Sequence, residues 1–311
     1  MKKKRKQHVS QSNEWKYNNS IKVNYLTEIK NLIQNLIESI LQIKILKKKN
    51  YGIIKDRETF IISKNLKKRK FLLLSNILNQ FLKKIKINCS KKKLFKQISK
   101  HDEIYYKKNP INNNSGGIGF NNSLFLYIFL KNINVDLIIE SGVWMGYTSF
   151  LIDQACKTNN KIKFDINFSK VIYKSKQSEY CEYDINEYDF KKKSKILKRS
   201  AIFFDDHFSQ LDRFLLSDSL NIPNMIFDDD INFEAIHSDG WPAIPTISMI
   251  RDKNFLNKVK WKNFGKIGKS NFKSKFDKKK LSKYLYATAP NISQITGYYI
   301  QPPMTFIVKK K

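Results

Sequence analysis

The stretch that decides the fold reads Val135-Asp-Leu-Ile-Ile-Glu-Ser-Gly-Val-Trp-Met-Gly-Tyr-Thr-Ser-Phe150. An apolar run ends in an acid, passes through two glycines and continues with apolar residues at helical spacing. This order predicts a β-strand, a tight turn and the N-terminus of a helix. In open α/β sheets, that turn is the place where nucleotide-like ligands bind.

The same pattern recurs further along the chain. Short apolar segments that end in acids predict parallel strands at 136–140, 161–165, 201–206 and 224–228. Helical patterns lie between them, at 123–131, after Gly146 and up to about Leu220. Helices between consecutive strands imply parallel pairing with right-handed crossovers.

The C-terminal segment predicts an antiparallel edge. The apolar runs 295–300 and 304–308 flank Gln301-Pro-Pro303 and are typical of a hairpin. We therefore expect an α/β fold: a Rossmann-like, mostly parallel sheet with helices on both faces and a C-terminal antiparallel hairpin. A helical basic extension precedes it.

The predicted division of the chain has three parts. Residues 1–20 form a basic flexible tail, 21–105 a basic helical extension and 106–311 the Rossmann-like domain. Within the extension, apolar residues spaced by three and four predict a helix up to about residue 49, and a second basic helix is expected at 77–87. The first helix has three interpretations: packing on the chain's own core, a coiled coil in a homodimer, or association with an anionic membrane.

Charge dominates the composition. The formal net charge is +32, with 59 Lys and Arg against 27 Asp and Glu. One interpretation is a polyanion partner, either nucleic acid or an anionic membrane surface reached through the N-terminal lysines. The other is compositional drift, because Lys greatly outnumbers Arg, the usual residue for bidentate phosphate contacts.

The sequence also bears on cellular location. The basic start is followed by polar residues, so no signal peptide is expected, and no apolar run is long enough for a transmembrane helix. Three widely spaced cysteines give no disulfide framework. We expect a cytoplasmic protein, with peripheral membrane association as an alternative.

Every predicted parallel strand ends in a carboxylate. Because the carboxyl ends of parallel strands line one edge of the sheet, these acids should share a crevice. Such a crevice suits a cationic ligand, ribose hydroxyls or a divalent metal. The alternative is that the acids are ordinary turn and helix-capping residues.

Three motifs carry a family resemblance. Glu140-Ser-Gly-Val-Trp-Met-Gly-Tyr-Thr-Ser149 resembles the first motif of class I S-adenosylmethionine-dependent methyltransferases, in the subgroup that includes macrolide sugar O-methyltransferases and cephalosporin-hydroxylase-like proteins. Phe204-Asp-Asp-His207 and Phe227-Asp-Asp229 resemble its two later acidic elements. The resemblance covers about residues 110–250. Trp144 departs from it, because many methyltransferases carry glycine there.

The resemblance implies a set of site residues. S-adenosylmethionine would be bound by Glu140, Gly142, Trp144, Gly146 and Thr148 of the first motif. Asp165 is expected to bind the ribose because of its position after the second strand. Asp189 and Phe190 could hydrogen-bond to and stack on the adenine, with a polar loop and one core Phe as the alternative. Mg²⁺ would be held by Asp206, Asp228 and Asp229, and the catalytic residues would be Asp206, His207 and His237. The acceptor would be a hydroxyl of a small molecule or glycan.

Each of these roles has a structural alternative. The two glycines would serve a tight connection that needs positive φ, the acids would cap helices, and the histidines would be structural or solvated. Zinc spacing, a Gly-x-Ser-x-Gly elbow and a P-loop are all absent from the sequence. The competing hypothesis is a basic nucleic-acid-associated or membrane-peripheral protein on a non-catalytic Rossmann scaffold.

Overall fold

The computed structural model describes residues 44–47, 59–62, 64–111, 114, 116–231, 244–252, 258–265 and 268–310. Side chains are described from Leu66 onward, except in 258–275. Two antiparallel pairs stand apart from the main sheet: β1 (Lys44–Lys47) with β2 (Thr59–Ile62), and β8 (Lys258–Gly265) with β9 (Gly268–Lys275).

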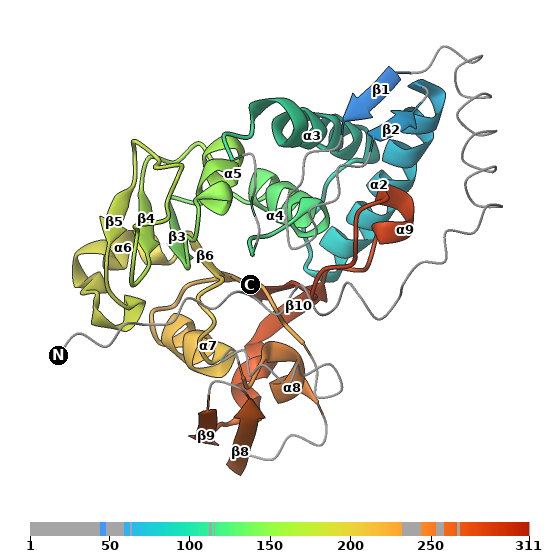
Figure 1. Cartoon of the computed structure of the whole chain (residues 1–311). Coiled ribbons are helices and arrows are strands. Elements are labelled where there is room, and N and C mark those ends of the chain that lie inside the picture. The colour runs from blue at the N-terminus through green and yellow to red at the C-terminus, as the bar shows by residue number, and fades with distance from the viewer. Residues whose placement is uncertain are drawn as a thin grey trace.

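A seven-stranded sheet forms the centre of the molecule (Figure 1). Its spatial order is β10 (Tyr284–Thr288), β11 (Thr305–Lys309), β7 (Asn224–Phe227), β6 (Ser200–Phe204), β3 (Leu137–Ser141), β4 (Lys161–Phe164) and β5 (Glu179–Cys181). Strands β3 to β7 pair in parallel, and β11 pairs antiparallel with both β7 and β10. The chain reverses direction across the sheet at β3, with β4 on one side and β6 on the other. This is the topological switch point, where open α/β sheets bind ligands.

Alternate residues of the central strands β3, β6 and β7 pack into two separate cores. In β3, Ile138 packs into one cluster, whereas Leu137 and Ile139 pack into the other. The first core lies under α4 (Phe120–Asn132) and α5 (Tyr147–Ala155), and the second under α7 (Gln210–Ser219) and α8 (Ile247–Arg251). Figure 1 shows α4 and α5 on one side of the sheet and α7 and α8 on the other. The predicted Rossmann-like α/β fold, with a mostly parallel sheet and a C-terminal antiparallel pair, is confirmed.

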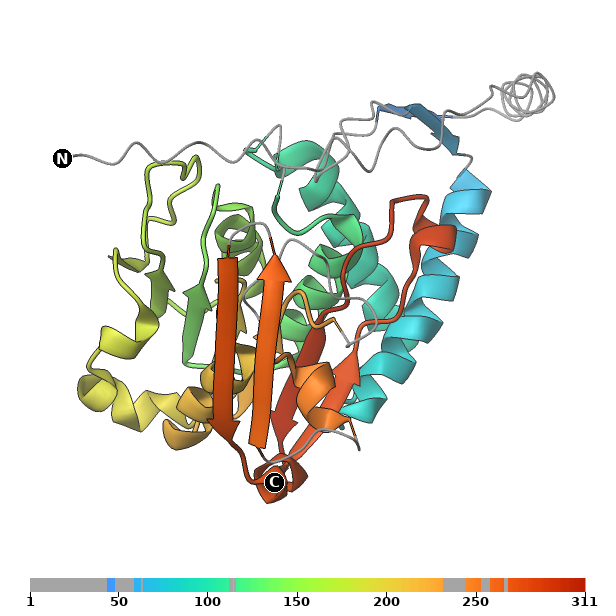
Figure 2. The same ribbon diagram turned by 60° about the horizontal axis from the view of Figure 1, so that its bottom comes forward.

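Two long helices, α2 (Lys64–Lys84) and α3 (Lys91–Glu103), pack together beside α4. Their buried residues, such as Phe81 and Ile98, belong to the same cluster as Phe306 of β11. Nearly every residue of α4 is buried because the helix lies between the sheet and this helix pair. One continuous core therefore spans both sides of residue 105. Figure 2 shows α2 in cyan along one edge of the molecule.

Several sequence predictions need correction. The helix expected up to residue 49 lies mostly outside the described residues. Its last part is wrong, because residues 44–47 form strand β1. The partner strand β2 is rich in β-branched and aromatic residues, which favour strands. The hairpin partner expected at 295–300 is also wrong, because β10 occupies the place beside β11. Strand β5 and helix α3 were not expected. The expected second helix is confirmed, and it begins earlier, at Lys64.

Two further observations concern the whole described chain. Its three cysteines, Cys89, Cys156 and Cys181, are buried free thiols. No helix among the described residues is both long and apolar enough to cross a bilayer.

Candidate active site

The glycine turn between β3 and α5 is shaped by contacts with the chain itself. Gly142 has a φ of +91°, and a Cβ there would lie 2.2 Å from the carbonyl oxygen of Asp205. Gly146 also has a φ of +91°, and its Cβ would lie 2.3 Å from the carbonyl oxygen of Tyr173. Both glycines are therefore needed for a tight connection, as one of the two interpretations held. Close approach to a ligand remains a prediction.

Asp165, the acid that follows β4, holds this turn in place. Its Oδ2 accepts hydrogen bonds from the amides of Val143 (2.9 Å) and Trp144 (3.4 Å). Trp144 has a φ of 50°, its side chain is 37% exposed, and the Nζ of Lys170 lies 4.5 Å from its ring centroid. Asp165 therefore lies against the glycine turn, where it binds backbone amides of its own chain, and its contact with a ribose remains a prediction.

Glu140 lies inside the protein. Its Oε2 is 2.6 Å from the Nζ of Lys163 on the adjacent strand, and Ser149 of α5 donates a hydrogen bond to it at 2.6 Å. Both charged side chains are fully buried. Burial raises the pKa of Glu140 although Lys163 opposes this shift. Glu140 is therefore a buried residue and not a surface turn acid, and its predicted contact with a cofactor remains a prediction. Thr148 is buried in the first turn of α5.

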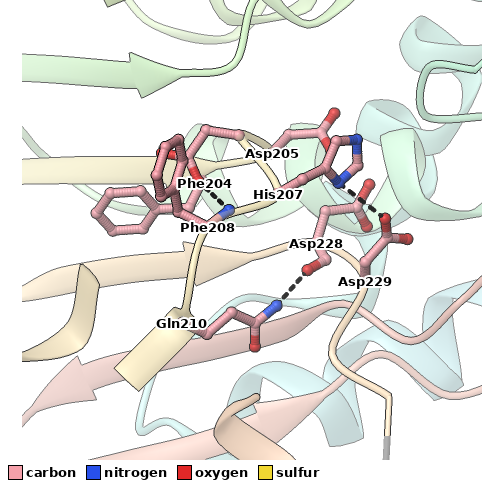
Figure 3. A pocket seen from close by; sticks show the side chains of 8 residues that line it. Phe204, Asp205, His207, Phe208, Gln210, Asp228 and Asp229 are labelled. Atoms are coloured by element: carbon pink, nitrogen blue, oxygen red, sulfur yellow. Dashed lines mark hydrogen bonds and ion pairs between the residues drawn. The ribbon is translucent and has the colours of Figure 1, made fainter. Parts of the chain in front are cut away.

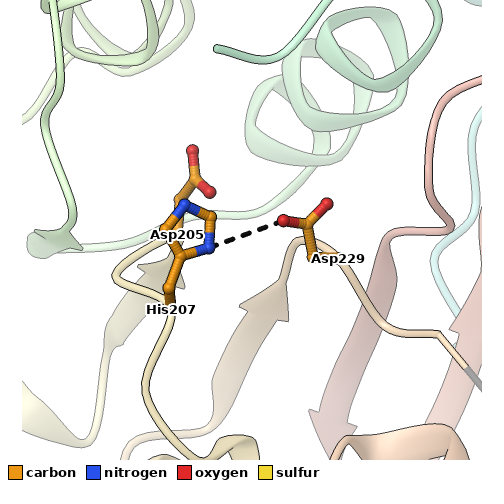
Figure 4. A group of neighbouring side chains, drawn as sticks. All are labelled: Asp205, His207 and Asp229. Carbon is orange, nitrogen blue, oxygen red and sulfur yellow. Dashed lines mark ion pairs between the residues drawn. The ribbon is translucent and has the colours of Figure 1, made fainter. Parts of the chain in front are cut away.

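A compact group of potential metal ligands lies across from the glycine turn. Asp205 and His207 follow β6 and Asp229 follows β7, and each offers a ligand atom within 4.8 Å of the others. His207 Nδ1 lies 3.5 Å from Asp229 Oδ2. Figures 3 and 4 show the three side chains converging above the ends of the two strands. Parallel register causes this, because Phe204 is aligned with Phe227.

The backbone is strained at two of these residues. His207 and Asp229 adopt φ angles of 57° and 52°, which non-glycine residues rarely do. Such conformations cost of order 1–3 kcal/mol each and concentrate at functional sites.

The carboxylates repel one another. Burial, with the neighbouring charges of Asp228 and Asp229, holds the pKa of Asp205 well above its usual range. Burial and Asp229 likewise hold the pKa of Asp228 high, although Asn122 of α4 donates a hydrogen bond to Asp228 Oδ1 at 3.0 Å. A divalent cation would relieve this repulsion. The two carboxylates are ligands that suit Mg²⁺ or Mn²⁺, whereas the imidazole of His207 is a ligand more typical of transition metals such as Zn²⁺ or Fe²⁺.

Asp206 lines the same pocket but does not belong to this converging group, which differs in this respect from the predicted metal set. Its Oδ2 is 2.9 Å from Arg213 Nε and accepts a hydrogen bond from Ser141 Oγ at 2.6 Å. Arg213, buried in α7, also makes two hydrogen bonds to Asp184, of 3.0 and 2.6 Å. Of the three predicted metal residues, Asp229 belongs to the converging group and Asp228 lies next to it in the chain. The group contains Asp205 and not Asp206.

Two predicted adenine contacts lie away from the group. Asp189 caps a short helical turn by accepting a hydrogen bond from the amide of Lys191. Phe190 is buried in the second core, where its ring contacts Tyr188 and Phe164. Phe190 is therefore a core residue in this structure, and stacking on a ligand would require it to leave the core. His237 lies outside the described residues.

Sequence reasoning missed four residues of this region: Asp205, Arg213, Asn122 and Gln210. Arg213 was detectable, because it occupies the apolar face of α7 beside Phe214, a position where arginine needs a buried acidic partner. Gln210 connects α7 to the strand end and to α8, since it donates to the carbonyl of Asp228 at 2.6 Å and accepts from Ile247 at 2.9 Å. Asn122 had no sequence signal, because its contact spans 106 residues.

The pocket at the strand ends is small. It encloses about 200 Å³, including space open to solvent, and its lining comprises Phe204, Asp205, Asp206, His207, Phe208, Gln210, Asp228 and Asp229. It suits a hydrated cation and one end of a larger ligand.

No protein-family model matches the sequence. No curated protein matches it either. Among solved structures, the chain is similar to an O-methyltransferase from Bacillus cereus in complex with SAH, at 10% identity over 77% of this chain and 100% of that chain, with a TM-score of 0.37. It is also similar to the O-methyltransferase TomG from Streptomyces achromogenes in complex with SAM, at 9% identity, 75% and 96% coverage and a TM-score of 0.38.

A third similar structure is a cmcI protein with Mg and SAM. The identity is 16% over 33% of this chain, and the TM-score is 0.26. The matched part spans half the length of that protein chain. All three likenesses are too distant to assign an activity to this chain.

Proposed function

We propose that the protein is an S-adenosylmethionine-dependent methyltransferase of the class I type that methylates a hydroxyl of a small molecule or glycan with the help of Mg²⁺. One observation carries this proposal: the glycine turn and the ligand group of Asp205, His207 and Asp229 meet at the switch point. Gly142 lies directly against the backbone of Asp205, whose amide donates to the carbonyl of Ser141 at 2.8 Å. A cofactor on the turn and an acceptor at the acids would therefore be neighbours.

The chemistry of the edge suits this cofactor. S-adenosylmethionine carries a positive sulfonium and a ribose, and acidic strand ends attract the first and accept hydrogen bonds from the second. When bound, it supplies an already activated methyl group, so the protein needs mainly to orient the acceptor hydroxyl and receive its proton. The amides at the start of α5 and the carboxylate of Asp165 line the proposed cofactor side.

The acceptor side rests on the converging ligand group. Asp205, His207 and Asp229 would hold the cation, whereas Asp206 pairs with Arg213. When bound, Mg²⁺ would lower the pKa of an acceptor hydroxyl. Only these three residues are assigned to the metal. For His207, the proposal keeps a role as general base as the alternative to metal binding. For His237, it keeps contact with the acceptor as the alternative to a solvated loop residue.

The acceptor class follows from the sequence resemblance to sugar O-methyltransferases and is part of the proposal. A non-catalytic Rossmann scaffold is the second candidate, favoured by two features. Asp165 and Glu140 both have partners within the chain, and the pocket is small.

Photo-crosslinking distinguishes the two candidates. Methyl-labelled S-adenosylmethionine is irradiated with the full chain, and the labelled peptides are mapped by mass spectrometry. We expect label within residues 140–148 or at 205–207, after strand β6. S-adenosylhomocysteine added before irradiation should prevent this labelling, whereas ATP should not. Label spread along the chain, or label that S-adenosylhomocysteine does not displace, would overturn it in favour of the scaffold.

A further inference from the structure

Positive charge is segregated along the chain. Residues 102–231, which form most of the sheet domain, contain 16 Lys and Arg against 18 Asp and Glu. Residues 64–101, which form α2 and most of α3, contain 13 Lys and Arg and no acid at all. Compositional drift would act on both segments alike. The excess on α2 and α3 therefore needs an explanation of its own.

The lysines gather where α2 turns into α3. Lys83, Lys84, Lys86 and the run 91–93 lie within eleven residues, and all six side chains are exposed. Among the described residues, none of the six forms an ion pair. Their charge is directed at solvent and attracts polyanions or anionic surfaces.

The same helix exposes leucines. Leu66, Leu72 and Leu73 are 50%, 49% and 54% exposed, although Phe71 and Leu74 beside them are buried in the core. Lys68 and Arg69 flank these leucines and are exposed as well. The outer face of α2 thus combines protruding apolar side chains at one end with lysines at the other.

We propose that the outer face of α2, with the lysines of the α2–α3 turn, binds the anionic surface of a lipid bilayer. We call this surface the basic helix face: Leu66, Lys68, Arg69, Leu72, Leu73, Lys83, Lys84, Lys86 and 91–93. Interfacial helices bury apolar residues at the headgroup boundary while Lys and Arg contact anionic lipids. Nucleic acid would also explain the lysines. The bilayer is favoured because three exposed leucines share the helix with the lysines, which is the combination of apolar and basic residues typical of an interfacial helix.

The geometry allows this contact. In Figures 1 and 2, α2 lies at the edge of the described part of the chain, on the side away from α6 (Ser194–Leu197), so the sheet does not lie between α2 and a flat surface that approaches from that side. The proposal is independent of the methyltransferase proposal, because it uses none of the strand-end residues.

Vesicle co-sedimentation of the full chain tests the proposal. The two vesicle types are phosphatidylcholine alone and phosphatidylcholine with phosphatidylserine. Each Lys near an anionic surface contributes about fivefold in affinity, so Lys83→Glu with Lys84→Glu should weaken binding to anionic vesicles at least about tenfold. Leu72→Ser with Leu73→Ser should weaken it several-fold while leaving the charge unchanged. Neither pair alters a buried residue, and unchanged thermal unfolding checks that the fold is intact.

The matched control is Lys191→Glu with Lys192→Glu, which makes the same charge change at exposed positions on the α6 side. It should weaken binding much less. An equal loss of vesicle affinity in the control would overturn the proposal, because the charge of the whole chain would then explain binding. Unchanged vesicle affinity in both α2 variants would also overturn it. Two results together would assign the face to nucleic acid. The leucine variant would bind vesicles as the wild type does, and the wild type would bind a polynucleotide more tightly than anionic vesicles, with that binding lost in the lysine variant.

Discussion

Arg213 Nε lies 2.9 Å from Asp206 Oδ2, and this contact determines which acids remain at the strand ends. The guanidinium is 2% exposed and also binds Asp184 beyond β5. Burial opposes the charge of Arg213, but Asp184 and Asp206 together raise its pKa. Asp206 is thereby neutralised within the protein, and Asp205, one residue earlier, faces His207 and Asp229.

Replacing Arg213 by Met should destabilise the fold strongly. The change leaves Asp184 and Asp206 without their shared cation, and breaking a buried ion pair costs about 3–5 kcal/mol. Urea denaturation measures the loss. Arg199→Met is the control, because Arg199 pairs with Asp136 at 3.2 Å but its side chain is 59% exposed, so its loss should stay below about 1 kcal/mol. Similar losses in both variants would contradict the assigned role of Arg213.

Alanine at Gly142 should disturb the strand ends. Its Cβ would overlap the backbone carbonyl of Asp205, and the φ of +91° is unfavourable for alanine. Strain and overpacking together predict a loss of about 2–4 kcal/mol in unfolding free energy. Gly119→Ala provides the comparison, since its Cβ would meet only the end of the Gln301 side chain, which can move. Equal stability of the two variants would show that the turn is looser than described.

The pair of Glu140 and Lys163 gives a test of the buried network. Lys163→Met alone should cost about 3–5 kcal/mol, because it leaves a buried carboxylate without a counter-charge. Adding Glu140→Leu should restore a large part of this loss. Denaturation of the two single variants and the double variant measures the coupling. Strictly additive losses would mean that the 2.6 Å contact contributes nothing.

The raised pKa of Asp205 predicts a pH dependence of stability. In the unfolded chain this carboxyl has an ordinary pKa of about 3.9. At pH values between this and the raised folded value, the folded protein binds more protons than the unfolded chain, so its stability falls as pH rises. Asp205→Asn removes this effect. Between about pH 4.5 and about pH 7.5, the unfolding free energy of the variant relative to that of the wild type should rise by of order 1 kcal/mol.

Urea midpoints at the two pH values measure that difference in metal-free protein, and Asp212→Asn is the control because its side chain is exposed on α7. Mg²⁺ should reverse the order at the higher pH, by stabilising the wild type and not Asp205→Asn. Parallel pH profiles for all three proteins would argue against repulsion among Asp205, Asp228 and Asp229.

Much of the fold followed from the sequence because its signals are local. The strand that ends at Glu140, the glycine turn and α5 were predicted together, since apolar alternation and the two glycines lie within fifteen residues. Strand β10 was missed because its sequence, Tyr284-Leu-Tyr-Ala-Thr288, is only half buried and its strand character depends on pairing with β11. Propensity alone does not specify such an edge strand.

The site was predicted less completely, for a different reason. Adjacent acids such as Asp205 and Asp206 are equivalent in the sequence, and only the position of Arg213 on α7 separates their roles. The positive φ angles of His207 and Asp229 also have no sequence signal, because neither residue is glycine. The convergence on one edge was predictable from topology, whereas the choice of ligands depended on tertiary contacts.

Calorimetric titration of the full chain with S-adenosylhomocysteine tests the central claim most directly. The account predicts micromolar, one-to-one binding that Gly142→Arg abolishes and Asp212→Asn leaves unchanged. Thermal unfolding of Gly142→Arg shows whether that variant is still folded, and Asp165→Ala, which weakens binding in this account, provides a milder second change. Absence of binding by folded wild-type protein, with or without Mg²⁺, would contradict the proposed methyltransferase function.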